Sequence, residues 1–140
     1  MADVEALVNA INTVGVMGKG IALQFAKVYP EMLEAYSKAC KTGDVQLGRM
    51  HVFERGVMFN PRYLVNFPTK GHWRSSSRIE DIETGLASLV DEIRARHIRS
   101  IAVPALGCGN GGLDWRVVRP AIGHALRSLP GVRVLLFAPA

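Results

Sequence analysis

Short apolar runs alternate with amphipathic segments along this chain, and that order is typical of an α/β domain. The runs that predict strands are Val4–Val8, Arg49–Phe53, Tyr63–Val65, Ile101–Val103 and Val132–Phe137. Such runs suit a sheet that is covered on both faces, where few strand residues need to be polar. We therefore predict a three-layer α/β/α domain with a mostly parallel mixed sheet over residues 1–140.

Helical spacing of apolar residues fills the gaps between these strands. The predicted helices are Gly20–Tyr29, Glu31–Cys40, a segment that begins at Ser77 and a segment from Asp114 to about Leu129. Ser77-Arg78-Ile79-Glu80 matches a capping box, in which the serine and the glutamate would each satisfy a backbone N–H group. Asp114 is the predicted N-cap of the last helix.

Three of the strands are followed by loops rich in glycine or polar residues. These loops are Asn9–Gly20, Asn66–Arg74 and Gly107–Trp115. Loops that leave the carboxyl ends of parallel strands converge on one crevice, and ligands bind there. Because glycines let backbone N–H groups approach phosphate oxygens, the pattern predicts a nucleotide site that cradles phosphates.

Composition narrows the class of protein. With 49% hydrophobic and 21% charged residues, the chain suits one folded domain, and no apolar run reaches the roughly 18 residues of a membrane span. We expect a cytoplasmic protein with reduced thiols at Cys40 and Cys108, because two cysteines make no disulfide framework. The net charge of +5 favours a polyanionic partner, and Lys19, Lys70 and Arg74 lie in the loops.

The glycines of the first and third loops admit two interpretations. Gly15, Gly18 and Gly20 match neither the dinucleotide fingerprint nor the phosphate-loop pattern, so they serve either a tight strand-to-helix turn or a backbone laid against a ribose or a diphosphate. The third loop has four glycines in six residues, at a cost of about 0.5–1 kcal/mol each relative to alanine. We favour a diphosphate nest for that loop.

Lys70 is the candidate reactive group of the second loop. A lysine with a lowered pKa can act as a base, an acid or an amine nucleophile, although a solvated surface lysine is the commoner case. Trp73 either stacks on a base or anchors the core. Cys108 is predicted to be a small residue in a tight loop, because no base lies beside it in the sequence. The histidines and cysteines lack metal-ligand spacing, so we expect no metal and no cofactor.

Three segments of this chain resemble macrodomains, the ADP-ribose-binding α/β/α family. They are Gly15–Phe25, Asn66–Arg74 and Leu106–Trp115, and the likeness extends over essentially the whole chain. More narrowly, the chain is similar to the macrodomains of the DarG antitoxins. That resemblance implies an enzyme that removes ADP-ribose from thymidine in single-stranded DNA and so reverses the modification made by the DarT toxin, a possible partner.

The resemblance also implies roles for individual residues. Asn12 matches a ribose-contacting asparagine and Lys70 a catalytic lysine, while His72, Trp73 and Arg74 would face the DNA. The residues implied for ADP-ribose binding are Asn9, Thr13, Gly15, Val16, Met17, Gly18, Lys19, Gly20, Ile21, Thr69, Leu106, Gly107, Cys108, Gly109, Asn110, Gly111, Gly112 and Phe137.

The chain departs from the family pattern at its start. Macrodomains usually begin with an additional strand that ends in a Gly-Asp pair, and neither precedes Val4 here. We therefore expect weaker adenine recognition, an unpaired sheet edge at Val132–Phe137 and no antitoxin C-terminal domain. Two other functions stay open: a reader that binds ADP-ribose without chemistry, and a hydrolase that acts on proteins or on ADP-ribose derivatives. A phosphate-binding domain of another α/β type is a third.

Overall fold

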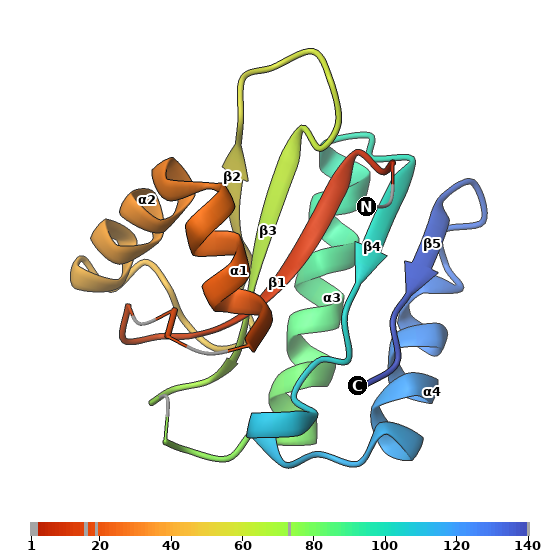
Figure 1. Cartoon of the computed structure of the whole chain (residues 1–140). Helices are drawn as coiled ribbons and strands as arrows, with labels where there is room; N and C mark the ends of the chain where they lie inside the picture. The colour runs from red at the N-terminus through yellow and green to blue at the C-terminus, as the bar shows by residue number, and fades with distance from the viewer. Residues whose placement is uncertain (1–2, 16, 19, 73, 140) are drawn as a thin grey trace.

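The computed structural model describes residues 3–15, 17–18, 20–72 and 74–139, with the side chains of residues 20 and 21 left aside. Within these ranges five strands form one sheet in the order β2-β3-β1-β4-β5 (Figure 1). The strands are β1 (Ala6–Asn12), β2 (His51–Glu54), β3 (Tyr63–Lys70), β4 (Ser100–Val103) and β5 (Arg133–Leu136). Only β2 pairs antiparallel, so the predicted mixed and mostly parallel sheet is confirmed.

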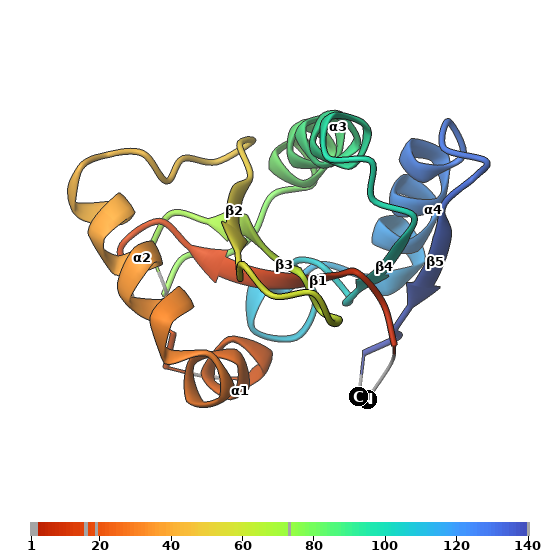
Figure 2. The ribbon, with the colours of Figure 1, turned by 90° about the horizontal axis from the view of Figure 1, so that it is seen from above.

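Helices cover both faces of the sheet, as the view from above shows (Figure 2). The helices α1 (Gly20–Val28) and α2 (Pro30–Lys41) lie on one side, and α3 (Ile79–Ala95) and α4 (Trp115–Leu126) lie on the other. Each face has its own apolar cluster, one around Met32 and Leu64 and one around Ile82 and Ile101. The three-layer prediction is confirmed. No helix in the described part of the chain is long and apolar enough to cross a membrane.

The two central strands are longer than predicted. β1 continues past Val8 to Asn12, and β3 continues past Val65 to Lys70. Because asparagine and proline are depleted in strands, the predicted strands ended before Asn9 and Asn66. Asn9 stays in its strand because its buried side chain is hydrogen-bonded to the amide of Asn66 on β3.

The predicted capping box at the start of α3 is wrong. The N-cap is Arg78, which makes no side-chain cap, and the hydroxyl of Ser77 is buried without a partner among the described residues. Ser77 instead packs under the third loop, where its N–H donates to the Gly111 carbonyl at 2.9 Å. Asp114 does cap α4, because its carboxylate accepts from the Arg116 N–H at 2.8 Å.

β5 is the last strand of the sheet order, and within the described residues no strand pairs with its outer side. The edge expected at Val132–Phe137 is thus present. Beyond β5, the Phe137 N–H still donates to the Val103 carbonyl at 3.0 Å. This bond keeps the residues after β5 alongside the end of β4.

Two helical glycines provide a matched test of the packing. A Cβ atom at Gly85 would lie 2.5 Å from Cζ of the fully buried Phe67, whereas a Cβ at Gly123 on α4 would meet nothing within 4 Å. We expect Gly85→Ala to lower the free energy of unfolding by about 1–2 kcal/mol, because overpacking outweighs the gain in helix propensity. Gly123→Ala should raise it by about 0.5–1 kcal/mol. Urea denaturation measures both, and equal stabilisation by the two variants would contradict the tight contact.

Candidate functional site

The three loops singled out in the sequence meet at the carboxyl ends of β1, β3 and β4, at the lower end of the sheet in Figure 1. Thr13 ties the first loop to the second, because its N–H and its hydroxyl both donate to the Gly71 carbonyl, at 2.9 and 3.0 Å. The bond from Ser77 to Gly111 ties the segment between the second loop and α3 to the third loop. The convergence that a parallel sheet predicts therefore exists in the folded chain.

Asn12 and Lys70 are the last residues of adjacent strands. The register of β1 and β3 pairs their Cα positions directly, across an irregularity between Ile11 and Asn12. Asn12 is buried and Lys70 is half-buried. The strand pairing thus brings together the two residues that sequence reasoning selected for chemistry, although 57 residues separate them in the chain.

Helix α2 fixes the side chain of Asn12. The hydroxyl of Tyr36, which is fully buried, lies 2.7 Å from the Asn12 carbonyl oxygen and 2.8 Å from its Oδ1. Oδ1 also accepts from the Val14 N–H at 3.1 Å. With its oxygen engaged in this way, the amide of Asn12 can serve a ligand as a donor through Nδ2, which suits hydroxyl or phosphate oxygens. Tyr36 lies within the predicted helix Glu31–Cys40 and was not predicted to belong to the site.

Asn9 lies under the site rather than in its wall. Its side chain is fully buried, and Nδ2 is 3.2 Å from Asn66 Oδ1 and 3.7 Å from Met17 Sδ. The Nδ2 atom of Asn66 is in turn 3.1 Å from Nδ1 of His51 on β2. We call Asn9, Asn66 and His51 the polar row. Asn66 begins the second predicted loop but was given no role of its own, and His51 was not predicted to belong to the site.

The glycines of the third loop have different tasks. A Cβ atom at Gly107, whose φ is +73°, would lie 2.7 Å from Leu113 Cδ1, and one at Gly111 would lie 2.5 Å from Ser77 Oγ, so a neighbouring side chain would have to move at either position. Gly109 and Gly112 face open space but have φ of +67° and +81°, which favours glycine for the backbone alone. In the described structure the exposed N–H groups of Gly109 and Asn110 make no hydrogen bond, which suits an anion.

Cys108 is poorly placed to be a nucleophile. Burial raises the pKa of its thiol, and the negative charge of Asp114 raises it further. Because the thiolate is the reactive form, both effects work against nucleophilic catalysis. The sulfur lies 3.8 Å from the Leu106 carbonyl oxygen, which fits a packing role.

The other predicted residues are placed as follows. Gly15 has φ of +91° and packs against Cys40 of α2, where a Cβ atom would be 3.7 Å from the cysteine Cβ. Met17, Thr69 and Leu106 are buried, whereas Gly18, His72, Arg74 and Phe137 are exposed. Gly20 and Ile21 begin α1. Val16, Lys19 and Trp73 lie outside the described residues.

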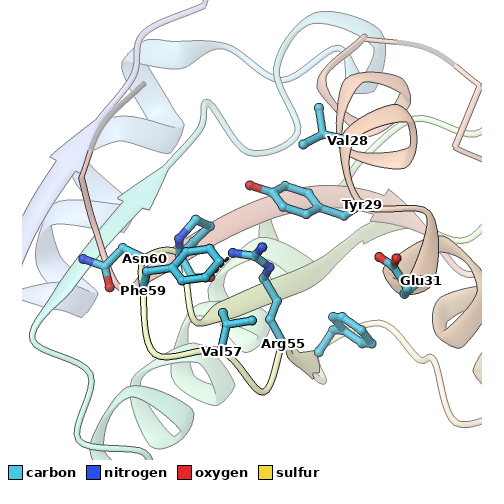
Figure 3. A pocket seen from close by; sticks show the side chains of 9 residues that line it. Val28, Tyr29, Glu31, Arg55, Val57, Phe59 and Asn60 are labelled. Carbon is cyan, nitrogen blue, oxygen red and sulfur yellow. Dashed lines mark hydrogen bonds between the residues drawn. The ribbon is translucent and has the colours of Figure 1, made fainter.

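A separate hollow of about 680 Å³ lies at the far end of the molecule, between the α1–α2 junction and the connection from β2 to β3 (Figure 3). Arg55 occupies it, with its guanidinium carbon 5.0 Å from the ring centre of Tyr29 and 5.4 Å from that of Phe59. Its Nη1 atom donates to the Pro61 carbonyl. These contacts hold the connecting loop in place, so we assign the hollow to structure and not to the site.

In the residues that the structure describes, no three His, Cys, Asp or Glu side chains gather as metal ligands would.

Comparisons with known proteins agree with this geometry. The Macro domain family model matches residues 8–122. A protein of Thermus aquaticus named DNA ADP-ribosyl glycohydrolase is 55% identical over 138 residues, which cover 99% of this chain and 38% of that protein. A protein of Mycobacterium tuberculosis with the same name is 52% identical and is covered to 40%. The chain thus spans about two fifths of the length of these curated relatives.

Solved structures extend the likeness to three dimensions. The macrodomain of Mycobacterium tuberculosis DarG matches with a TM-score of 0.98 at 52% identity, over 99% of this chain and 91% of that one. Thermosipho africanus DarTG in complex with ADP-ribose matches with a TM-score of 0.89 at 35% identity, over 97% of this chain and 38% of that one.

The polar row makes stability depend on pH. Burial lowers the pKa of His51 below its ordinary 6.5, against an opposing effect of the Asp44 charge. Below about pH 6.5, His51 therefore takes up a proton more readily in the unfolded chain than in the folded chain. The free energy of unfolding falls as the pH falls. We expect a smaller decline between about pH 7 and about pH 5 in His51→Asn, which keeps an acceptor near the position of Nδ1 but cannot titrate. Urea denaturation across this range measures the difference, and parallel curves would refute the assignment.

Proposed function

Because the chain belongs to the macro domain family, we propose that it is an ADP-ribosyl hydrolase that removes ADP-ribose from thymidine in single-stranded DNA. The observation that carries the proposal is the pairing of Asn12 with Lys70 at the same end of the sheet as the third loop, in which Gly109 and Asn110 are exposed. Relatives that match nearly the whole of this chain bear the name of that activity. The Thermosipho africanus structure contains ADP-ribose, which supports this ligand for the shared fold.

In the proposed complex the diphosphate lies against the N–H groups of Gly109 and Asn110. Both groups are exposed and unbonded in the described structure, and such a backbone concavity binds anions. Asn12 donates from Nδ2 to a hydroxyl of the ribose that carries the base. Its oxygen is held by Tyr36 and Val14, so the direction of this donor is set before the ligand arrives.

The reaction breaks the bond between the anomeric carbon of that ribose and a thymine nitrogen. In direct hydrolysis a water oxygen bonds to the carbon, the electron pair of the broken bond stays on the thymine nitrogen, and the Lys70 ammonium supplies the proton which that nitrogen takes up. In the covalent route the Lys70 amine attacks the anomeric carbon and thymine leaves with the electron pair. The adduct then opens to a Schiff base that water hydrolyses.

In the same proposal the DNA lies against the loop after β3. His72 and Arg74 are exposed in the loop after β3, and the chain carries a net charge of +5, both of which suit contacts to a phosphate backbone. The enzyme that would make this substrate is a DNA ADP-ribosyl transferase of the DarT type. One relative, from Thermosipho africanus, is named as a fusion of such a transferase with the glycohydrolase. We place both activities in the cytoplasm, where bacterial DNA lies.

Lys70→Ala is the first test. We expect the rate of ADP-ribose release from a single-stranded oligonucleotide with ADP-ribosylated thymidine to fall at least about a hundredfold, as for loss of an acid or a nucleophile. Affinity for free ADP-ribose should change only a few-fold. Lys27→Ala, which removes an exposed lysine in the last turn of α1, is the control and should act like wild type.

The same experiment separates the alternatives. A borohydride-trapped adduct in wild type that is lost in Lys70→Ala supports the covalent route, and release without an adduct supports proton donation. Undiminished release by Lys70→Ala would move the chemistry to another group. If wild type binds ADP-ribose but releases none from DNA, the protein is a reader, and release from a modified protein instead would identify a different acceptor.

Tyr36→Phe tests how Asn12 is held. Removal of the hydroxyl takes away a buried hydrogen bond to Asn12, so we expect the free energy of unfolding to fall by about 1 kcal/mol. Affinity for ADP-ribose should fall about five- to tenfold, because the Asn12 donor loses its fixed direction. Tyr63→Phe, at the opposite end of β3, should keep the affinity of wild type. Calorimetric titration decides, and equal affinities in both variants would remove Tyr36 from the site.

A further inference from the structure

The polar row crosses three neighbouring strands in a straight line. The sheet register pairs Asn9 of β1 with Asn66 of β3, and Asn66 with His51 of β2. Asn9 and Asn66 are both fully buried. Their amides face the layer of α1 and α2, because Asn9 Nδ2 lies 3.7 Å from Met17 Sδ and Asn66 Nδ2 lies 3.4 Å from Met32 Sδ.

Burial of the polar row lowers the free energy of unfolding relative to an apolar core. Amides transferred from water to an apolar layer are destabilising unless every donor and acceptor is satisfied, and here Asn9 Oδ1 has no partner in the described structure. Apolar side chains at these positions would suit the apolar cluster around them better. A role other than stabilising the sheet would account for this cost.

Hydrogen bonds give the row a direction. Nδ2 of Asn66 lies 3.1 Å from Nδ1 of His51, and this contact is a hydrogen bond from the amide when the imidazole carries its proton on Nε2. The same bond turns Asn66 Oδ1 toward Asn9, whose Nδ2 donates to it. Asn9 in turn contacts Met17, which lies in the segment between β1 and α1. The amides of Asn66 and Asn9 thus connect His51 on β2 to Met17 in the first loop.

We propose that His51 and Asn66 are positioning residues which, through Asn9, hold Met17 and the described part of the loop between β1 and α1 (13–15 and 17–18) in place for binding of the ADP-ribosyl group. This inference rests on the proposed function, since that loop is one wall of the proposed site. Asn9 and Asn66 do not touch the substrate, because both are fully buried. Asn9, predicted from the family resemblance to contact ADP-ribose, becomes a positioning residue here.

The test compares His51→Leu, which removes the acceptor at the end of the row, with His51→Asn, which restores one near the position of Nδ1. We expect His51→Leu to raise the Kd for ADP-ribose and the KM for modified DNA about tenfold, with kcat within about threefold of wild type. His51→Asn should regain most of the affinity. A role confined to folding predicts neither the split between KM and kcat nor the rescue.

Val65→Ala is the matched control. Val65 is fully buried on β3 beside Asn66, but it packs into the α3–α4 cluster on the opposite face. Its truncation should lower the stability and leave the Kd unchanged. Asn66→Leu, an apolar replacement of similar volume, is a second variant and should weaken binding at least as much as His51→Leu.

The outcomes separate this proposal from the one on which it rests. If His51→Leu and Asn66→Leu are folded and bind ADP-ribose as tightly as wild type, the polar row is structural and the inference is wrong. If wild type binds ADP-ribose without releasing it from DNA, the proposed hydrolase fails, while the series of Kd values still decides the row. Absence of binding by wild type would overturn both.

Discussion

The parallel pairing of β1 with β3 is the constraint on which the candidate site depends. Its register sets Asn12 opposite Lys70 at the carboxyl ends of the strands. It also sets Asn9, three residues before Asn12 in β1, opposite Asn66. Because side chains alternate between the faces of a strand, a slip by one residue would send every one of them to the wrong face. The backbone hydrogen bonds between β1 and β3 therefore place Asn12 and Lys70 at the end of the sheet and Asn9 and Asn66 in its buried part.

Helix α2 links this pairing to the rest of the fold. It places the Tyr36 hydroxyl on Asn12 and the Met32 sulfur on Asn66, so one helix contacts both the edge residue and the core residue of the neighbouring strands. Its packing against Gly15 adds a third contact, at the turn that leaves β1. A helix that carries none of the proposed reacting groups thus holds Asn12 in place, as is usual when a rigid scaffold supports functional loops.

Periodicity and apolar runs were enough to predict the layers, the mixed sheet and the meeting of the loops. They failed at the ends of β1 and β3, because propensity treats Asn66 and Pro68 as loop formers, while the structure satisfies the asparagine by a partner 57 residues away. The capping box failed for a similar reason, since Ser77 is packed against Gly111. Local patterns cannot reveal bonds that exist only after distant strands have paired, and Tyr36 and His51 were missed on that account.

The third loop shows why a glycine-rich motif does not by itself describe a binding site. A Cβ atom at Gly107 or Gly111 would force Leu113 or Ser77 to move, and Gly107 also has a positive φ. Gly109 has open space around it and a positive φ, and its N–H group is unbonded in the described structure. Two glycines therefore hold the loop in a fixed shape, so that the amides between them can be presented to an anion without a further loss of backbone entropy on binding. The glycines that pack the loop and the residues proposed to bind an anion are thus neighbours in the sequence, but they are different residues.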